Sequence, residues 1–204
     1  MVKKPKLRTY DNAGRVQAQE QRQDAMLDAA GDELFKGSWQ SWQKTSLDTL
    51  ARRAGVTKQT LLRYFGSKEG LLMQTLVRGY SQIRDQRWSA PVGDIAGIVD
   101  NLLDHYDAWG ERSRKIGAWQ QSGSTFLVRL VQAARQVHYD WVDYAFAPWL
   151  ERLSGDERAR RRAALIAICD VQTWSILTLD LGLARPDVHA ILSGLIERLL
   201  ANDG

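Results

Sequence analysis

Apolar residues recur along this chain mostly at steps of three and four residues, and few stretches alternate with a period of two. The first spacing places apolar side chains on one face of an α-helix, whereas the second is typical of a half-buried strand. We therefore expect an all-α protein, divided into helices by glycine and proline residues. Helices are expected at about residues 16–35, 46–54, 58–65, 68–87, 92–109, 111–118, 123–150, 156–183 and 186–201, with a loop at 37–44.

The sequence SLDTLARRAGVTKQTLLRY, residues 46–64, has the pattern of a helix-turn-helix. Two short helices that cross steeply need a small residue at the crossing, a turn residue that tolerates positive φ, and several apolar anchors. Ala51 and Gly55 meet the first two requirements, and Leu50 and Leu61 are among the anchors. The apolar residues of this segment are therefore assigned to packing, which leaves its polar residues for another role.

Polar and cationic side chains gather at the N-terminal end of the second of these helices, the end that enters the major groove in such motifs. Thr57 is expected to cap the helix, and the N–H groups of the first turn favour a phosphate. Gln59 can pair with adenine, Lys58 with guanine and Thr60 with thymine, and Arg63 follows one turn later. The segment predicts a DNA-binding module.

Basic charge is concentrated in the same part of the chain. The net charge is +4, but residues 1–88 carry 16 Lys and Arg against 9 Asp and Glu, whereas residues 89–204 carry 12 against 15. This asymmetry fits a phosphate-binding module joined to a regulatory domain. The first 14 residues are either a basic flexible arm that follows the minor groove or an ordinary disordered terminus. Its basic residues are Lys3, Lys4, Lys6 and Arg8.

Composition argues against several other classes of protein. The longest apolar runs, such as Ala163–Cys169, fall short of the roughly 20 residues that a membrane-spanning helix needs. No apolar segment of the secretory kind follows the positive N-terminus, and a single cysteine provides neither a disulfide framework nor a zinc site. The sequence contains no phosphate loop, nucleophile elbow or glycine-rich cofactor loop. We therefore expect no enzyme activity, no cofactor and no metal site.

The helix-turn-helix continues into a specific pattern, in which A-G-V-T is followed by Y-F-x-S-K-E-x-L. Through these residues the chain resembles the tetracycline-repressor (TetR) family of bacterial transcriptional regulators over about residues 22–80. The resemblance implies three helices that bind DNA, a fourth that connects, and a C-terminal domain that binds a ligand and forms a dimer. The expected parts are an arm at 1–14, the helix-turn-helix domain at 15–66, the connecting helix at 67–88 and the second domain at 89–204.

The resemblance also implies which residues contact DNA. Tyr64 and Lys68 are expected at phosphates, and Phe65 is expected in the core. Leu62 stands where the family very often has an aromatic residue, so one backbone contact is expected to be lost or replaced by Arg63. The residues at DNA-contacting positions are Thr45, Thr57, Lys58, Gln59, Thr60, Arg63, Tyr64 and Lys68.

The second domain is rich in tryptophan, which suits the wall of a pocket for an apolar or aromatic ligand and also suits an ordinary core. Asp170 lies inside an apolar stretch, where it could orient a ligand amine or hydroxyl, or form a structural ion pair with an arginine. The candidate ligand-binding residues are Trp109, Trp119, Phe126, His138, Trp141, Tyr144, Asp170 and Trp174.

One main hypothesis and one alternative follow. The main hypothesis is a repressor that a small, largely apolar or aromatic molecule releases from a pseudo-palindromic, double-stranded DNA operator. Residues 177–183 and the last helix carry more apolar surface than one helical pair can bury, so a homodimer through the last two helices is expected. The alternative keeps DNA binding but makes the C-terminal domain a protein-docking or dimerisation module without a small-molecule ligand. Either protein is expected in the cytoplasm, on the nucleoid when bound to DNA, and not in a membrane.

Overall fold

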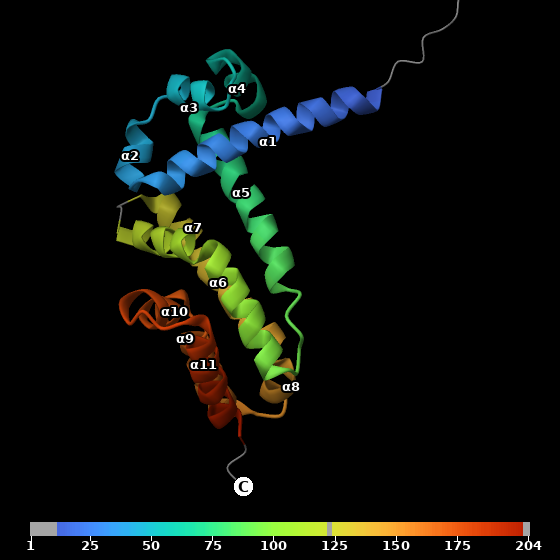
Figure 1. The fold of residues 1–204 in the computed structure, drawn as a ribbon, viewed down its shortest axis with the longest axis vertical. Coiled ribbons are helices and arrows are strands. Elements are labelled where there is room, and N and C mark those ends of the chain that lie inside the picture. The colour runs from blue at the N-terminus through green and yellow to red at the C-terminus, as the bar shows by residue number, and fades with distance from the viewer. Residues whose placement is uncertain (1–11, 122–123, 202–204) are drawn as a thin grey trace, which may run out of the picture. The chain divides into compact units, whose positions relative to one another are not determined.

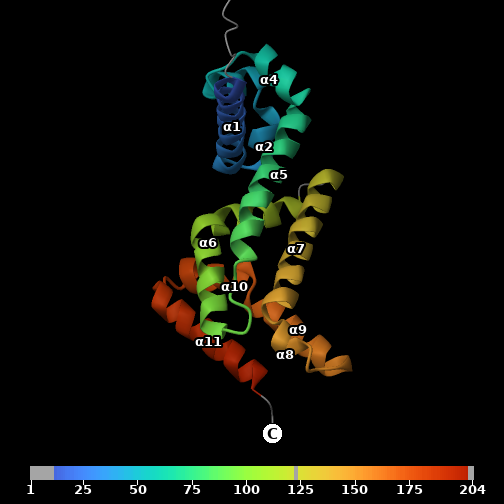
Figure 2. The same ribbon diagram turned by 90° about the vertical axis from the view of Figure 1, so that its right-hand side faces the viewer.

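The computed structural model describes residues 12–121 and 124–201, and over that part it is helical with no strand (Figure 1, Figure 2). The predicted all-α fold is confirmed. The chain divides into two compact units, residues 1–78 and 79–204, and the boundary falls inside helix α5 (Lys68–Arg87), which belongs to both. The four basic residues of the predicted N-terminal arm lie outside the described residues.

The first unit consists of four helices and the beginning of α5. Helix α1 packs on α2 and α3, and α3 packs on α4. Apolar residues of all these helices meet in one core, where Leu34, Leu50, Leu61 and Leu71 are each 1% exposed or less. The four helices are α1 (Asn12–Lys36), α2 (Trp39–Lys44), α3 (Leu47–Arg53) and α4 (Lys58–Phe65).

Helix α2 occupies the segment that was expected to be a loop, so that prediction is wrong. Ser38 begins the helix by accepting a hydrogen bond from the Ser41 N–H at 3.2 Å. Trp42 fixes it to the core, because its side chain is only 2% exposed. A helix of six residues is too short to show a clear period and too short to be stable alone. It depends on tertiary contacts that the sequence pattern does not display.

The second unit contains the rest of α5 and the remaining helices. Helix α11 packs along α6, α10 lies against α6, and α9 contacts both α7 and α11. Figure 2 shows α6, α7 and α11 as the long members of this unit. The elements are α6 (Ile95–Ala118), η1 (Trp119–Gln121), α7 (Thr125–Ala145), α8 (Ala147–Leu150), α9 (Gly155–Ile168), α10 (Val171–Ser175), the π-helical turn η2 (Ile176–Asp180) and α11 (Arg185–Leu200).

Gly110 does not end a helix, as the sequence suggested, because α6 continues through it to Ala118. The residue serves close packing instead. A Cβ atom at this position would lie 2.5 Å from Cζ3 of Trp174, so only glycine admits the indole ring. The ring belongs to α10, which is distant in sequence, and the reason for this glycine is therefore tertiary.

The single helix expected at residues 156–183 is broken at Cys169 and Asp170. The Asp170 side chain accepts a hydrogen bond from the Gln172 N–H at 2.8 Å and thereby caps α10. Aspartate is a favourable N-cap residue because it satisfies a free N–H of the first turn. This capping role replaces the ion pair with an arginine that was one of the two expectations for Asp170.

Ion pairs join the helices of this unit at its surface. Arg162 of α9 binds both carboxylate oxygens of Asp143 in α7, at 2.6 and 2.8 Å. At the start of α11, Arg185 pairs with Asp104 and Asp107 of α6. Among the described residues, no group of three or more His, Cys, Asp or Glu side chains is arranged to hold a metal ion.

Candidate nucleic-acid interface and polar core of the second unit

Helices α3 and α4 form the helix-turn-helix that the sequence predicts. Ala51 is 2% exposed at the crossing, and its carbonyl accepts a hydrogen bond from the Val56 N–H at 2.9 Å. Gly55 has a φ of 66°, the left-handed conformation that the turn requires and that glycine adopts without strain. Leu61 is buried on the inner face of α4. These contacts fix the direction in which the start of α4 points.

The N-terminal turn of α4 presents its polar side chains to solvent. Thr57 caps the helix as predicted, accepting a hydrogen bond from the Thr60 N–H at 3.2 Å. Its hydroxyl also lies 3.0 Å from that of Thr60. Lys58 forms an exposed ion pair with Asp48 at 3.2 Å, and Gln59 is exposed. An exposed pair of this kind is worth little, so Lys58 can exchange Asp48 for a base or phosphate at small cost.

Lys68 and Thr45 have structural partners. The Lys68 ammonium donates to the carbonyls of Trp42 at 2.5 Å, Gln43 at 3.1 Å and Thr45 at 2.6 Å. Burial lowers the pKa of this ammonium, while the nearby Glu69 raises it. The three N–H groups of the ammonium thus cap the C-terminal end of α2. The phosphate contact that was expected for Lys68 would require breaking these hydrogen bonds. The Thr45 hydroxyl lies 3.0 Å from both the Glu33 carboxylate and the Ser41 carbonyl.

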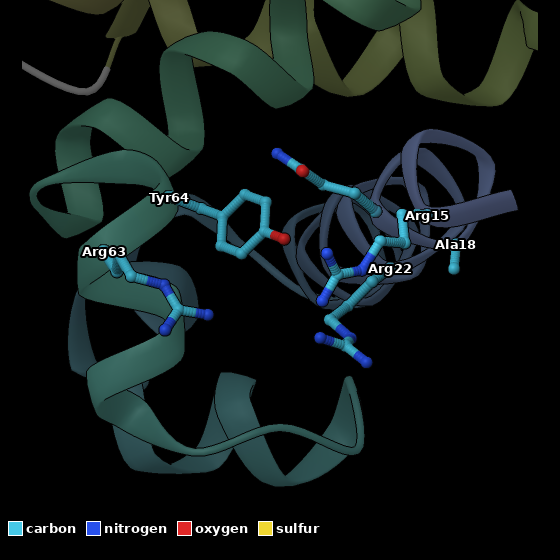
Figure 3. Close-up of a pocket in the computed structure, with 6 residues that line it drawn as sticks. Arg15, Ala18, Arg22, Arg63 and Tyr64 are labelled. Atoms are coloured by element: carbon cyan, nitrogen blue, oxygen red, sulfur yellow. The ribbon is translucent and has the colours of Figure 1, made fainter. Parts of the chain in front are cut away.

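A basic hollow of about 480 Å³ lies between α1 and α4 (Figure 3). Arg15 and Arg22 reach it from α1, while Arg63 and Tyr64 reach it from α4, and none of the described residues that line it is acidic. The Arg63 guanidinium carbon lies 5.7 Å from the centre of the Tyr64 ring. Three guanidinium groups around one hollow favour an anion, and the phosphates of DNA are the obvious candidates.

Sequence reasoning missed Arg15 and Arg22. A signal was available, because residues seven apart share a face of a helix, and the hollow's other two α1 residues, Ala18 and Gln19, occupy the intervening positions of that face. The helix was expected to begin near residue 16, which left Arg15 outside it. The structure begins α1 at Asn12.

Two of the predicted ligand-binding tryptophans belong to the core of the second unit. Trp141 is fully buried, and its indole N–H donates to the Arg87 carbonyl at 2.9 Å. Trp174 is 6% exposed and packs beside Tyr106, with ring centres 5.6 Å apart. His138 stacks beside Trp141 at 6.3 Å. Trp141, Tyr106 and His138 contact the guanidinium of Arg87, a residue that sequence reasoning did not select.

The other predicted ligand-binding aromatic residues have different neighbours. Tyr144 stacks on Trp88 and donates its hydroxyl to the Trp88 carbonyl at 3.1 Å. Trp109 carries the Arg112 guanidinium 4.8 Å above its ring. Phe126 is 38% exposed in the first turn of α7, whereas Trp119 is buried in η1. The eight residues therefore do not line one continuous pocket wall.

Two histidines in this core are held neutral. Burial, together with the smaller effects of the Arg87 and His138 charges, lowers the pKa of His105 to about 2. Burial and the charge of Arg87 also lower the pKa of His138 to about 4, against a hydrogen bond to the Ile166 carbonyl and the charge of Asp170, which raise it. At neutral pH, Arg87 is therefore the charged member of this group of three.

Comparisons with known proteins agree with this architecture. Residues 29–75 match the family described as bacterial regulatory proteins, tetR family, and no curated protein matches the chain significantly. A TetR-family transcriptional regulator from Streptomyces coelicolor is 20% identical over 88% of this chain and 79% of its own, with a TM-score of 0.60.

Two further solved structures have the same fold. A TetR-like transcriptional regulator from Rhodococcus sp. RHA1 is 20% identical over 89% of this chain and 97% of its own, with a TM-score of 0.63. The fatty acid degradation regulator FadR from Bacillus halodurans is 17% identical over 88% and 98%, with a TM-score of 0.58. Residues 29–75, which include the helix-turn-helix of α3 and α4, thus match the tetR family of bacterial regulatory proteins, and the fold of the chain is that of the TetR-family regulators described above.

Proposed function

We propose that the protein is a cytoplasmic repressor that binds a pseudo-palindromic operator as a homodimer and leaves it when a small molecule binds the second unit. The observation that carries the DNA-binding part is the exposed polar turn at the start of α4, beside a hollow with three arginines. Lys58, Gln59 and Thr60 would read base edges, whereas Arg63, Tyr64 and the two α1 arginines would hold phosphates.

Exposed apolar side chains support the homodimer. In and after η2, Ile176, Leu179 and Leu181 are 51%, 49% and 62% exposed, and Ile191 and Leu195 continue the apolar surface on α11. The stretch Gly155–Asp180 is apolar and long enough to qualify as a weak membrane-span candidate, yet only 22% of its most apolar window is buried. A second copy of the chain, packed across a two-fold axis, would cover this surface.

Introducing a charged side chain into this apolar surface tests whether the surface forms the dimer. We expect Leu195→Glu to shift the protein from dimer to monomer in analytical ultracentrifugation, while Ala190→Glu, at an exposed position on the same helix, leaves the dimer intact. A monomeric wild-type protein would contradict this part of the proposal.

The operator can be found without knowing the regulated genes. The full-length protein is used to select from a random library of DNA duplexes, and the expected product is a pseudo-palindrome with half-sites about 34–36 Å apart, one helical turn. Gln59→Ala should then weaken binding to the selected duplex about 5-fold to 150-fold, equivalent to about 1–3 kcal/mol, with unselected duplexes unaffected. Gln40→Ala, at an exposed position on α2, is the matched control. Enrichment of no sequence would contradict operator recognition.

One observation favours the alternative, a C-terminal domain without a small-molecule ligand. Trp141 and Trp174, which were expected to line a pocket, are packed in the core. A hollow of about 370 Å³ in this unit is lined by Trp149, Arg152, Leu153, Arg161 and Leu200, and none of them is a predicted ligand residue. Arg87 supports ligand binding instead, because it is buried and forms no ion pair with any described residue, whereas buried arginines normally have a counterion. Release of the selected duplex by a small molecule decides between the two functions.

A further inference from the structure

Arg87 is a buried cation without a counterion. It is the last residue of α5, and only 4% of its surface is exposed. Within residues 12–121 and 124–201, no carboxylate forms an ion pair with it, and its buried Nε atom has no hydrogen-bond partner. Arginines that are buried in proteins are normally paired, because an unpaired charge in the interior is strongly unfavourable.

The groups that touch this guanidinium are all neutral. Its central carbon lies 4.1 Å from the centre of the Trp141 ring and 5.9 Å from that of Tyr106. His138 lies within 3.0 Å of the Ile166 carbonyl through Nε2, and a carbonyl can only accept, so Nε2 carries the proton. Nδ1 of His138 then accepts from Nη2 of Arg87 at 3.3 Å. Ring faces and one imidazole lone pair solvate the cation in part, but they do not neutralise it.

Unsatisfied polar atoms also occur at the end of α5 and on the facing part of α6. Five buried side-chain atoms in the described residues have no hydrogen-bond partner, and four of them belong to Gln86, Arg87, Asn101 and His105. The first two end α5, while Asn101 and His105 are one turn apart on α6. Native cores contain few such atoms, and a cluster of them calls for a specific explanation. The Nε–H of Arg87 is a donor that a carboxylate oxygen can satisfy, whereas the amide oxygens of Gln86 and Asn101 are acceptors and need a different partner.

We propose that Arg87 anchors a buried site for a monocarboxylate with an aromatic or apolar body, and that this monocarboxylate is the effector. This inference rests on the proposed ligand response of the second unit. The planar guanidinium offers Nε–H and Nη–H groups in the geometry that binds a carboxylate at two points. The Trp141, Tyr106 and Trp174 rings provide apolar contact for the body.

The charges around the site determine the class of ligand. His105 and His138 are both neutral at pH 7, so Arg87 is the positive charge at the site, and Asp170, which caps α10 and forms no ion pair with Arg87, is the nearby negative charge. The guanidinium therefore still lacks a direct anionic partner, and one carboxylate would supply it. A neutral ligand would leave the guanidinium unpaired, and a cation would be repelled. The Trp174 ring packs on Gly110 and beside Tyr106, so a ligand body that contacts Tyr106 from this side would have to displace the ring.

The first experiment needs no ligand. Arg87→Met keeps the long apolar stem but removes the charge, and replacing an uncompensated buried charge by an apolar side chain is often neutral or stabilising. We expect thermal unfolding of the ligand-free Arg87→Met variant at the wild-type Tm or above it. A Tm lowered by several degrees would show that Arg87 is a structural residue and would overturn the proposal.

The second experiment compares matched probes. Benzoate, phenylacetate, indole-3-acetate and decanoate are each paired with the primary amide of the same skeleton, and binding to the full-length protein is measured by calorimetry and by the shift in Tm. We expect at least one carboxylate to bind tenfold or more tightly than its amide, and Arg87→Met to weaken that binding tenfold or more. Arg84→Met, an exposed position one turn earlier on α5, should bind as the wild type does.

Three results would overturn the carboxylate site: equal binding of acids and amides, undiminished binding by Arg87→Met, or no binding of any carboxylate. Asp170→Asn removes the nearby negative charge, and we expect it to leave carboxylate binding unchanged or to strengthen it. Weaker carboxylate binding by this variant would contradict a site in which Arg87 is the anchor. A different result would contradict the proposed function, in which the ligand releases the protein from DNA. In that case a carboxylate binds through Arg87 but leaves the affinity for the selected duplex unchanged.

Discussion

Acidification should destabilise the second unit through its two buried histidines. Burial and the Arg87 charge hold the pKa of His138 at about 4 and that of His105 at about 2, whereas an unfolded histidine titrates near 6.5. Between these values the unfolded chain binds protons that the folded chain does not. The free energy of unfolding therefore falls as the pH is lowered from 7, and the loss from His138 is complete only below about pH 4.

The size of the effect follows from the two pKa values of each histidine. One pKa unit corresponds to about 1.4 kcal/mol, and pH 5 lies about 1.5 units below the unfolded value, so each histidine costs about 2 kcal/mol between pH 7 and pH 5. The two together cost about 4 kcal/mol, a large part of the stability of an ordinary domain. The groups that set this cost are Arg87, the other histidine and Asp170.

Urea unfolding, followed by tryptophan fluorescence at pH 7 and pH 5, measures this loss. The substitution His138→Gln retains an amide that can donate to the Ile166 carbonyl and accept from Arg87, but it cannot titrate. This variant should lose about half as much stability as the wild type over the same range, while the exposed control Gln132→Ala should lose the full amount. Equal losses in the wild type and His138→Gln would refute the assignment of the effect to His138.

Three further predictions concern single side chains. Arg22→Gln, at the hollow of Figure 3, should weaken binding to all duplexes and reduce the slope of log K against log salt concentration by about 1; a change confined to one sequence would contradict a phosphate contact. Lys68→Met should lower the free energy of unfolding of the first unit by about 1.5–3 kcal/mol in urea titrations, because three carbonyls lose a charged donor, and an unchanged stability would contradict the cap. Gly110→Ala should cost about 1–3 kcal/mol through its clash with Trp174, whereas Gly117→Ala meets no atom within 4 Å and should be neutral or stabilising; the reverse order of Tm values would contradict the packing role.

Local signals were sufficient for the helix-turn-helix. The bounds of α4 at residues 58–65 were predicted correctly, because Thr57 is a capping residue and Gly66 ends the helix with a φ of 73°. The apolar spacing likewise identified Leu50 and Leu61 as core residues. Each of these features is determined by residues within one or two turns, and a single sequence displays them.

Features that depend on distant residues could not be predicted in this way. Gly110 looks like a helix terminator until Trp174 is seen to pack on it. Asp170 in an apolar run suggested either a ligand contact or an ion pair with an arginine, and its role as the cap of α10 was not predicted because the break in the helix at this point is not visible in the sequence. The isolation of Arg87 is visible only after Trp141 and His138 have packed around it. The candidate ligand site was thus the least predictable part.

Helix α5 is one uninterrupted helix whose first half belongs to the first unit and whose second half belongs to the second unit. Its 20 residues correspond to about 30 Å of helix, and the unit boundary falls between Arg78 and Gly79. A glycine inside a helix costs about 1 kcal/mol relative to alanine, and nothing lies within 4 Å of the position that a Cβ at Gly79 would take. The unit boundary within α5 therefore coincides with a glycine, a residue of low intrinsic helix propensity.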